Sequence, residues 1–218
     1  MKVSRLHLFT AAFNVQDHLL TLERGLLDLH AVLTSRGCEL NVLVIDDKSK
    51  DDTLSMLQAM QKRLGNRFSF EILANPENLG VADNLIFGYR WATKDANPET
   101  VVAVIDSDGE HNPLSIPRHL DWIENEDFDG IIGCVEYPGH LVSDDDRHMM
   151  HFCGPMQSRL AGLNDDPDKF TIQSPGYQIY RSAFVTDLIH ISLPKYHQFF
   201  EANYGPYPRW DNTASSPF

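Results

Sequence analysis

The sequence predicts an α/β fold in which a mostly parallel sheet carries helices on both faces. Two observations lead to this prediction. Short apolar strands alternate with amphipathic helical segments up to about residue 135, and the main polar clusters of that region follow the ends of strands. A strand, helix, strand order favours parallel pairing, because each helix brings the chain back to the same edge of the sheet. The 218 residues suffice for one large domain.

The first two strands and helices have clear local signals. A strand is expected over residues 3–12, and Asn14 is then a plausible helix N-cap. The helix that follows should run to about residue 35, because leucines recur in it at spacings of three and four. A second strand is expected over 40–45. Asp51 or Asp52 should cap the next helix, which carries an apolar stripe at Leu54, Leu57, Met60 and Leu64.

The same alternation continues through the middle of the chain. We expect strands over residues 68–73, 101–105 and 131–135, with helices over 82–92 and from about 113 to 123. Trp91 and Trp122 fall on these helices and are expected in the core.

The regular pattern breaks at residue 136 and returns only near residue 171. Residues 136–170 contain several prolines, glycines and aspartate runs, and an irregular span of this length is typical of a functional loop or lid. A strand over 171–180 and a helix over 182–190 follow. We therefore expect the chain to divide at residue 135 into a regular half, 1–135, and a loop-rich or lid half, 136–218, of the same domain.

Composition narrows the classes of partner and compartment. The formal charge of −13 argues against a nucleic-acid partner and against a polybasic membrane surface. Three cysteines without a CxxC spacing indicate reduced thiols, and hence a cytoplasmic protein. No stretch has the ~18 apolar residues that a transmembrane segment needs. Peripheral membrane contact stays open.

Two carboxylates stand at the end of an apolar strand. Asp106 and Asp108 follow Val-Val-Ala-Val-Ile, and alternate side chains of an extended chain share a face. Adjacent unpaired carboxylates are costly unless a cation is present, and an all-oxygen site suits Mg²⁺ or Mn²⁺. Glu110 is close enough in sequence to be a third ligand. The predicted metal ligands are therefore Asp106, Asp108 and Glu110.

Polar residues follow each of the first four predicted strands. They stand at Phe13-Asn14, at 46–52, at 75–80 and at 106–108. In open α/β sheets, ligands bind at the carboxyl ends of the strands, so these four loops should form one pocket.

These loops carry a family resemblance. Ala11 to Val15, Ile45 to Thr53, Asn78 to Gly80 and Asp106 to Pro113 stand in the order and spacing of four motifs of the GT-A glycosyltransferases of family 2. Within that family the chain most closely resembles the dolichyl-phosphate-mannose-synthase-like branch, whose later Ser-Gly-Phe-Arg-Leu-Tyr-Arg segment is similar to residues 174–184. The chain departs from the family pattern at Val15, Lys48 and Gln178, where the family has Glu, Gly and Arg.

The resemblance implies a GT-A fold and a UDP- or GDP-sugar donor, held with Mn²⁺ or Mg²⁺. It also implies that residues 1–135 form the nucleotide-sugar-binding half and residues 136–218 the acceptor-binding or lid half of the same domain. In that case Asp47 would accept a hydrogen bond from the base, and its replacement by alanine should leave the fold intact. Asp106 would reach the ribose or the metal, and Asp108 would hold the metal. The donor-binding residues implied are Ala11, Ala12, Phe13, Asn14, Asp46, Asp47, Asn78, Gly80, Asp106, Ser107 and Asp108.

Inversion at the sugar needs a carboxylate that takes the proton of the acceptor hydroxyl. The family places this group well beyond the metal motif, which favours Glu201 over Asp165 or Asp166. The acceptor would be a carbohydrate or a lipid phosphate, and with a phosphate acceptor no base is needed.

Two other functions fit parts of the pattern. A catalytically silent homologue would bind the nucleotide sugar without transferring it. A receiver-like signalling domain also has an Asp-Asp pair that binds Mg²⁺, but that pair follows its first strand, whereas Asp46 and Asp47 follow the second.

Overall fold

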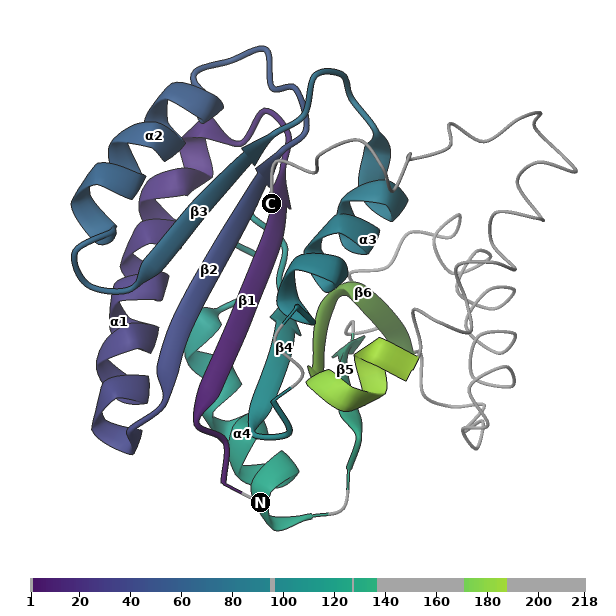
Figure 1. The fold of residues 1–218 in the computed structure, drawn as a ribbon. Helices are drawn as coiled ribbons and strands as arrows, with labels where there is room; N and C mark the ends of the chain where they lie inside the picture. The colour runs from purple at the N-terminus through teal and green to yellow at the C-terminus, as the bar shows by residue number, and fades with distance from the viewer. Residues whose placement is uncertain (1, 95–96, 127, 137–170, 188–218) are drawn as a thin grey trace, which may run out of the picture.

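The computed structural model describes residues 2–94, 97–126, 128–136 and 171–187. In this part of the chain, six strands form one sheet in the order β3-β2-β1-β4-β6-β5 (Figure 1). The strands are β1 (Arg5–Ala12), β2 (Glu39–Asp46), β3 (Ser69–Ala74), β4 (Thr100–Val104), β5 (Gly130–Glu136) and β6 (Thr171–Arg181). The helices are α1 (Leu19–Arg36), α2 (Thr53–Leu64), α3 (Gly80–Ala92) and α4 (Ile116–Asn125), with short 3₁₀ turns η1 (Gln16–His18) and η2 (Pro113–Ser115).

The first four strands pair as the alternation predicts. The strands β3, β2, β1 and β4 are parallel neighbours, with Ala12 opposite Asp46 and Asp46 opposite Ala74. The sequence order does not predict the position of β6. This strand is antiparallel to both β4 and β5 and lies between them. A helix joins β4 to β5, yet these two strands are not neighbours.

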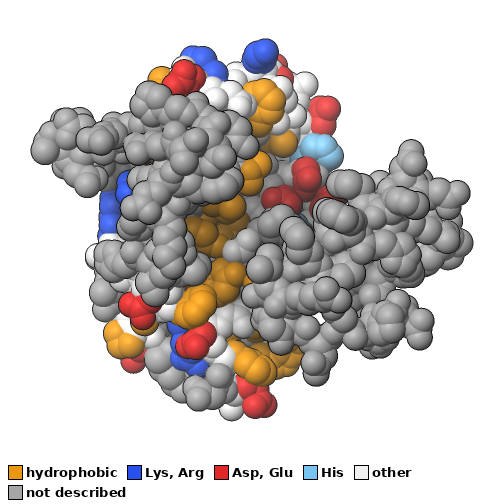
Figure 2. All heavy atoms as spheres, turned by 90° about the vertical axis from the view of Figure 1, so that its right-hand side faces the viewer, with side chains coloured by type: hydrophobic (Ala, Val, Ile, Leu, Met, Phe, Trp, Pro, Cys, Tyr) orange, Lys and Arg blue, Asp and Glu red, His pale blue; other side chains and the backbone are white. Residues whose placement is uncertain are grey.

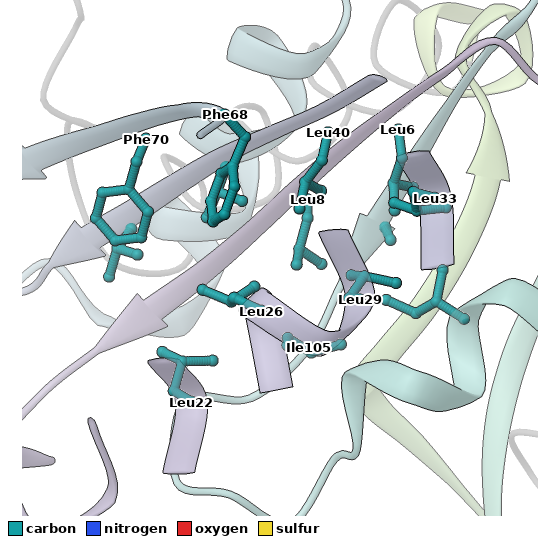
Figure 3. Close-up of a cluster of buried hydrophobic side chains, with 14 of the residues drawn as sticks. Leu6, Leu8, Leu22, Leu26, Leu29, Leu33, Leu40, Phe68, Phe70 and Ile105 are labelled. Carbon is teal, nitrogen blue, oxygen red and sulfur yellow. The ribbon is translucent and has the colours of Figure 1, made fainter. Parts of the chain in front are cut away.

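Helices cover both faces of the sheet, as predicted. One face carries α1, α2 and α4 over a large apolar cluster, and Figure 3 shows leucines of α1 directed at β1 and β2. Leu26, Leu29 and Leu33 are fully buried there. The other face carries α3, whose Trp91 packs in a smaller cluster with Phe9 of β1. A Cβ at Gly88 would overlap the Phe9 ring, so a glycine lets α3 approach β1 closely.

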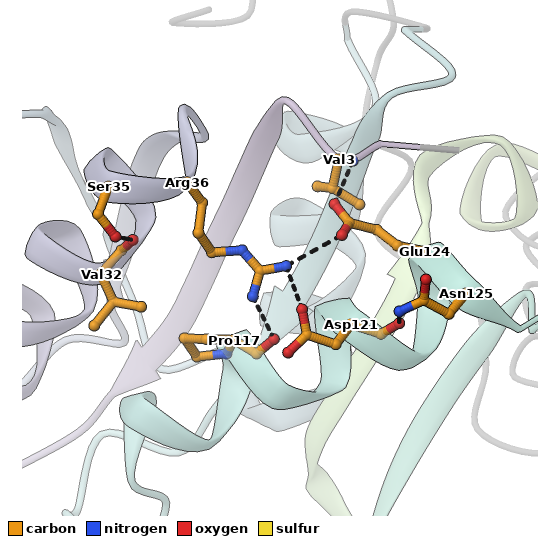
Figure 4. Close-up of polar contacts among 8 residues, drawn as sticks. All are labelled: Val3, Val32, Ser35, Arg36, Pro117, Asp121, Glu124 and Asn125. Carbon is orange, nitrogen blue, oxygen red and sulfur yellow. Dashed lines mark hydrogen bonds and ion pairs between the residues drawn. The ribbon is translucent and has the colours of Figure 1, made fainter.

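A polar cluster joins helices α1 and α4 near the beginning of β1 (Figure 4). The guanidinium of Arg36 donates to the Pro117 carbonyl at 2.9 Å and forms ion pairs with Asp121 at 2.6 Å and Glu124 at 3.2 Å. Glu124 also accepts a hydrogen bond from the backbone N–H of Val3 at 2.7 Å. These contacts fix α4 against α1 and against the residues that precede β1.

Two local expectations are wrong. Asn14 is not a helix N-cap: its φ is +55°, and η1 begins two residues later at Gln16. Trp122 is 40% exposed on α4, whereas Trp91 is buried as predicted. The cap of α2 comes from Asp51, whose Oδ1 accepts from Thr53 N at 3.0 Å, while Asp52 occupies the cap position without a side-chain bond. None of the helices in the described ranges is long and apolar enough to cross a bilayer.

Candidate active site

The ends of four parallel strands are tied together at one edge of the sheet. The Asp47 N–H donates to the Ala12 carbonyl at 2.8 Å, and the Asn75 N–H donates to the Asp46 carbonyl at 2.9 Å. On the other side, the Ser107 hydroxyl donates to the Ala11 carbonyl at 2.7 Å. The four polar loops therefore form one surface, as the sequence predicts.

The loop after β1 is held by the loop after β2. The Asn14 N–H donates to Ser49 Oγ at 3.0 Å, and Asn14 Oδ1 accepts from the Lys50 N–H at 2.7 Å. This exchange explains the left-handed backbone of Asn14, because asparagine tolerates that conformation better than most residues. Phe13 beside it is 44% exposed, which leaves its ring available at the rim of the site.

Asp47 is buried within the folded structure and only 4% exposed. Its Oδ1 accepts from Asn75 Nδ2 and Leu79 N, both at 2.8 Å, and its Oδ2 accepts from Gly80 N at 2.9 Å. Burial by itself would raise the pKa of Asp47, but these hydrogen bonds outweigh burial and lower the pKa. The carboxylate thus caps the start of α3. This burial contradicts the premise that Asp47 stands outside the packed structure, whereas survival of the fold without it and base recognition by Asp47 stay predictions.

Asp46 has an oxygen without a partner in the described part of the chain. The residue is 2% exposed at the end of β2, and its Oδ2 accepts one long hydrogen bond from Ser49 N at 3.4 Å. Its Oδ1 is buried and makes no hydrogen bond there. Buried carboxylate oxygens are normally satisfied, so a ligand hydroxyl is a suitable partner for this atom.

The loop before α3 closes over Asp47. Asn78 Nδ2 donates to the Asp47 carbonyl at 3.2 Å, and Gly80 takes up a φ of +79° at the first residue of α3. Asn75 and Asn84 are both buried and joined by a 2.7 Å hydrogen bond. The sequence motif predicted Asn78 and Gly80 as site residues. It did not predict Asn84, because nothing in the helix pattern indicates that this asparagine is buried against another polar side chain.

The acidic loop after β4 is built differently from the prediction. Strand β4 ends at Val104, so Asp106 and Asp108 lie in a turn rather than on one face of an extended strand. Gly109, with a φ of +87°, reverses the chain, and Asp108 Oδ1 accepts from Glu110 N at 3.0 Å. The two aspartates are near each other because of this turn, and not because of strand alternation.

Several charged side chains gather at the acidic loop. Burial raises the pKa of Asp106, the nearby His111 ring lowers it, and the carboxylates of Asp108 and Glu110 raise it. His111 Nδ1 accepts the Asp106 N–H at 3.0 Å and lies 3.4 Å from Asp106 Oδ2. On the side of the molecule drawn in Figure 2, acidic side chains lie next to a histidine, beside a band of hydrophobic side chains.

The acidic loop fits a divalent cation that is completed by a ligand. Across the described ranges, no three His, Cys, Asp or Glu side chains converge in a ready-made metal cage. Mg²⁺ is commonly bound by one or two carboxylates together with substrate phosphates. Burial and the carboxylates of Asp108 and Glu110 raise the pKa of Asp106, and a cation at this loop would stabilise its charged form. Asp106 and Asp108 suit this role, and Glu110 is an exposed neighbour.

Strand β6 reaches the acidic loop through a glycine. A Cβ on Gly176 would overlap the carboxylate of Asp106, so only glycine lets β6 pass at this point. Two residues later, Gln178 accepts a 2.5 Å hydrogen bond from the Tyr89 hydroxyl of α3. Gln178, which replaces the family's arginine, thus contacts the helix that follows the Asp47 loop.

The predicted catalytic carboxylates are not in the described part of the chain. Glu201, Asp165 and Asp166 fall in residues 137–170 and 188–218, so their role as a base stays a prediction, as does the division at residue 135.

Comparisons with known proteins agree with the fold and the motifs. The family model described as glycosyl transferase family 2 matches residues 9–188. An uncharacterised protein of Methanocaldococcus jannaschii, MJ0544, is 24% identical over 179 residues, which cover 81% of this chain and 72% of that protein. An undecaprenyl-phosphate mannosyltransferase of Micrococcus luteus is 29% identical over 147 residues, covering 66% of this chain and 56% of that enzyme.

A solved structure shares the architecture. A mannosyltransferase from Pyrobaculum calidifontis, in complex with GDP-Man and Mn²⁺, superposes with a TM-score of 0.55 at 14% identity. The match covers 84% of this chain and 46% of that one. The chain thus has a GT-A fold and spans about half the length of these two mannosyltransferases.

Proposed function

The chain belongs to glycosyl transferase family 2, and on this premise we propose that it transfers a sugar from a nucleotide-diphosphate sugar to an acceptor, with inversion and with a divalent metal. One observation supports the proposal most. The edge that joins the four strand ends combines a buried oxygen of Asp46, without a partner in the described part of the chain, with three carboxylates in the loop of Asp106, Asp108 and Glu110. A polar, metal-bridged diphosphate ligand would satisfy both features.

The proposed donor is a GDP-sugar, with a UDP-sugar as the alternative. The Pyrobaculum enzyme was solved with GDP-Man and Mn²⁺, and the Micrococcus relative is named as a mannosyltransferase. Phe13 at the rim would contact the base, and Asp46 would accept from a ribose hydroxyl. Asp47 would orient the loop of Asn78 and Gly80 around the base, while its remaining lone pairs could accept from the base N–H.

In this proposal, Asp106 and Asp108 would hold Mn²⁺ or Mg²⁺, with Glu110 as a third ligand or a neighbour. Such a cation would stabilise the charge that develops on the departing nucleoside diphosphate. The bond from the anomeric carbon to the diphosphate would break while the acceptor oxygen bonds to that carbon from the opposite side. With a hydroxyl acceptor, the proton would pass to a base, for which we propose Glu201, with Asp165 and Asp166 as alternatives. A lipid-phosphate acceptor would need none.

The test is a thermal-shift titration of the whole chain. Ligands that bind only the folded state raise its melting temperature by mass action. We expect GDP and GDP-mannose to raise it in the presence of Mn²⁺ and to do so far less in EDTA. UDP and UDP-glucose measure base selectivity in the same assay.

The matched variants are Asp108→Asn and Asp121→Asn. Both replace an aspartate without changing its size, but Asp121 belongs to the distant ion-pair cluster of α4. Asp108→Asn should lose the metal response, and Asp121→Asn should keep it. Equal nucleotide binding with Mn²⁺ and EDTA would refute the metal-bridged donor. Phosphorylation of the chain by acetyl phosphate, without nucleotide binding, would instead favour the receiver-like alternative.

Normal nucleotide binding does not by itself establish transfer. A catalytically silent homologue would pass the thermal-shift test, so release of GDP from GDP-mannose is followed with candidate acceptors added. Donor binding without acceptor-stimulated release would favour the silent alternative.

A further inference from the structure

A second cavity lies beside the acidic loop, on the side of the sheet that carries α4. Its volume is about 440 Å³, and its described lining includes Glu110 and His111 of the acidic loop, Trp122 of α4 and Tyr177 of β6. The cavity is therefore continuous with the loop that we propose to hold the metal. None of the residues assigned to donor binding lines it, so it is a separate place for a ligand.

The polar groups in this cavity form a chain whose proton positions can be derived. The Ser115 hydroxyl donates its one proton to the Asn112 carbonyl at 2.7 Å. The Tyr177 hydroxyl lies 2.9 Å from Ser115 Oγ, and because we assign the Ser115 proton to the Asn112 carbonyl, we assign Tyr177 as the donor of that hydrogen bond. The same Tyr177 hydroxyl lies 2.6 Å from His119 Nδ1. Since its proton is already used, Tyr177 accepts there, and His119 Nδ1 carries the proton.

The derived tautomer leaves His119 Nε2 as a hydrogen-bond acceptor. A neutral imidazole has one N–H, which is here on Nδ1, so Nε2 presents a lone pair. Within the described residues Nε2 has no hydrogen-bond partner, and His119 lines the cavity. Burial lowers the pKa of His119, and the charge of Arg118 lowers it further, which favours the neutral ring. Burial likewise raises the pKa of Tyr177 to about 12 and keeps its hydroxyl protonated.

The rest of the described lining suits an uncharged ligand that contains a ring. Trp122 is 40% exposed, and Arg118 lies over its ring at 5.1 Å from the centroid. No described lining residue is a lysine or an arginine, and Glu110 adds a negative charge. Ligand sites typically combine an aromatic surface with a few placed polar groups. An anionic phosphate would meet the lone pair of His119 and the carboxylate of Glu110, which disfavour it.

We propose that this cavity binds the acceptor of the transfer reaction and that the bound part is a carbohydrate, with the ring against Trp122 and one hydroxyl donating to His119 Nε2. That the ligand is an acceptor rests on the proposed function. That the bound group is a carbohydrate rests on the cavity alone, whose lining favours a carbohydrate over the phosphate of a lipid-phosphate acceptor.

Two NMR measurements on the whole chain test the cavity without donor or metal. The first is the ring ¹⁵N spectrum of His119, which we expect to show the Nδ1–H tautomer at pH 7. The second is a titration with methyl α-mannoside, methyl α-glucoside and methyl α-galactoside, each to high millimolar concentration, followed at the Trp122 indole N–H. Mannose 1-phosphate and inorganic phosphate are titrated in the same way.

The key variant is His119→Asn, with Trp122→Ala as a second variant and Trp91→Phe as the control. Asparagine can replace the Nδ1–H donor to Tyr177 but has no equivalent of Nε2. We expect His119→Asn to weaken binding of the best glycoside about 5-fold or more, the scale of one lost hydrogen bond. Trp122→Ala should weaken it at least as much. Trp91 is buried on the other face of the sheet, so Trp91→Phe should bind as the wild type does.

The outcomes separate the cavity from the proposed function. Weakened glycoside binding in both variants, with an unchanged response to GDP and Mn²⁺, supports an acceptor pocket. The same weakening in a chain that binds no nucleotide would refute the proposed function and the acceptor role, and would retain a carbohydrate site. The inference is overturned by an Nε2–H tautomer, by no glycoside shifting Trp122, by unchanged binding in both variants, or by phosphate binding that needs His119.

Discussion

Asp47 and Asp106 occupy equivalent places, each just after a parallel strand, but their surroundings are opposite. Asp47 is 4% exposed and accepts hydrogen bonds from two backbone N–H groups and one amide, which lower its pKa. The Asp106 side chain is 48% exposed, and burial and carboxylate neighbours raise its pKa. The first carboxylate is held by groups of the folded structure, whereas the second stays open to solvent, as a ligand site would require. A motif aspartate can therefore serve architecture or binding, and its hydrogen-bond donors decide which.

The largest expected effect comes from removing each carboxylate in turn. Asp47→Ala leaves the buried donors of Asn75, Leu79 and Gly80 without an acceptor, so we expect a loss of about 3 kcal/mol in the free energy of unfolding. Asp106→Ala removes an exposed, repelled charge and should change stability by less than about 0.5 kcal/mol. Urea denaturation measures both, and equal losses would abolish the contrast.

The second test overpacks two glycine contacts. Gly176→Ala would push against the carboxylate of Asp106, and Gly88→Ala would push against the ring of Phe9. Both should destabilise the protein by about 1–3 kcal/mol, the cost of an oversized side chain in a packed site. Only Gly176→Ala should also weaken the thermal response to GDP with Mn²⁺. A metal response weakened equally by Gly88→Ala would show a general effect of lost stability.

The third test uses pH and has opposite signs for the two carboxylates. Asp47 has a pKa below the ordinary value of 3.8 in the folded state, so its stabilisation is present above pH 3.8 and is lost as pH falls through the folded pKa. Asp106 has a raised pKa, so the folded state binds its proton more tightly than the unfolded state does. This proton binding stabilises the folded state at acidic pH, and the stabilisation is lost as pH rises above 3.8.

Denaturation curves from acid to neutral pH, in EDTA, measure these contributions. The free energy of unfolding of Asp106→Asn, relative to that of the wild type, should increase as pH rises above 3.8. That of Asp47→Asn, relative to the wild type, should decrease as pH rises from strongly acidic values. The same slope for both variants would contradict the assigned environments.

The smallest expected effect concerns the turn after β2. Lys48 has a φ of +63°, in the left-handed region that costs a non-glycine residue about 1–2 kcal/mol. Glycine removes this strain but loses more entropy on folding, so Lys48→Gly should stabilise by only about 0.5 kcal/mol. Lys50→Gly, at a neighbouring position without a positive φ, should destabilise slightly. Thermal unfolding measures both, and destabilisation by Lys48→Gly would mean that its side chain makes a contact worth more than the strain.

Much of the fold could be predicted because its signals are local. The leucine spacing of α1 and the apolar runs of β2 and β4 specify elements within a few residues of their observed bounds. The four polar loops meet because parallel strands present their carboxyl ends at one edge, which is a property of the topology and needs no side-chain detail. Asn14 was predicted wrongly because its partners, Ser49 and Lys50, lie in a different loop.

By itself, the sequence determined the strand and helix order, the motifs of the family and the edge of the sheet where they gather. The elements and the edge follow from periodicity along the chain, and the motifs follow from the resemblance to the family. The tertiary structure alone decided that β6 enters between β4 and β5, that Asp47 is capped while Asp106 is left open, and that His119 and Tyr177 share a cavity with the acidic loop. Each of these depends on contacts between residues tens of positions apart. The environment of a side chain is set by such contacts, and no local pattern encodes them.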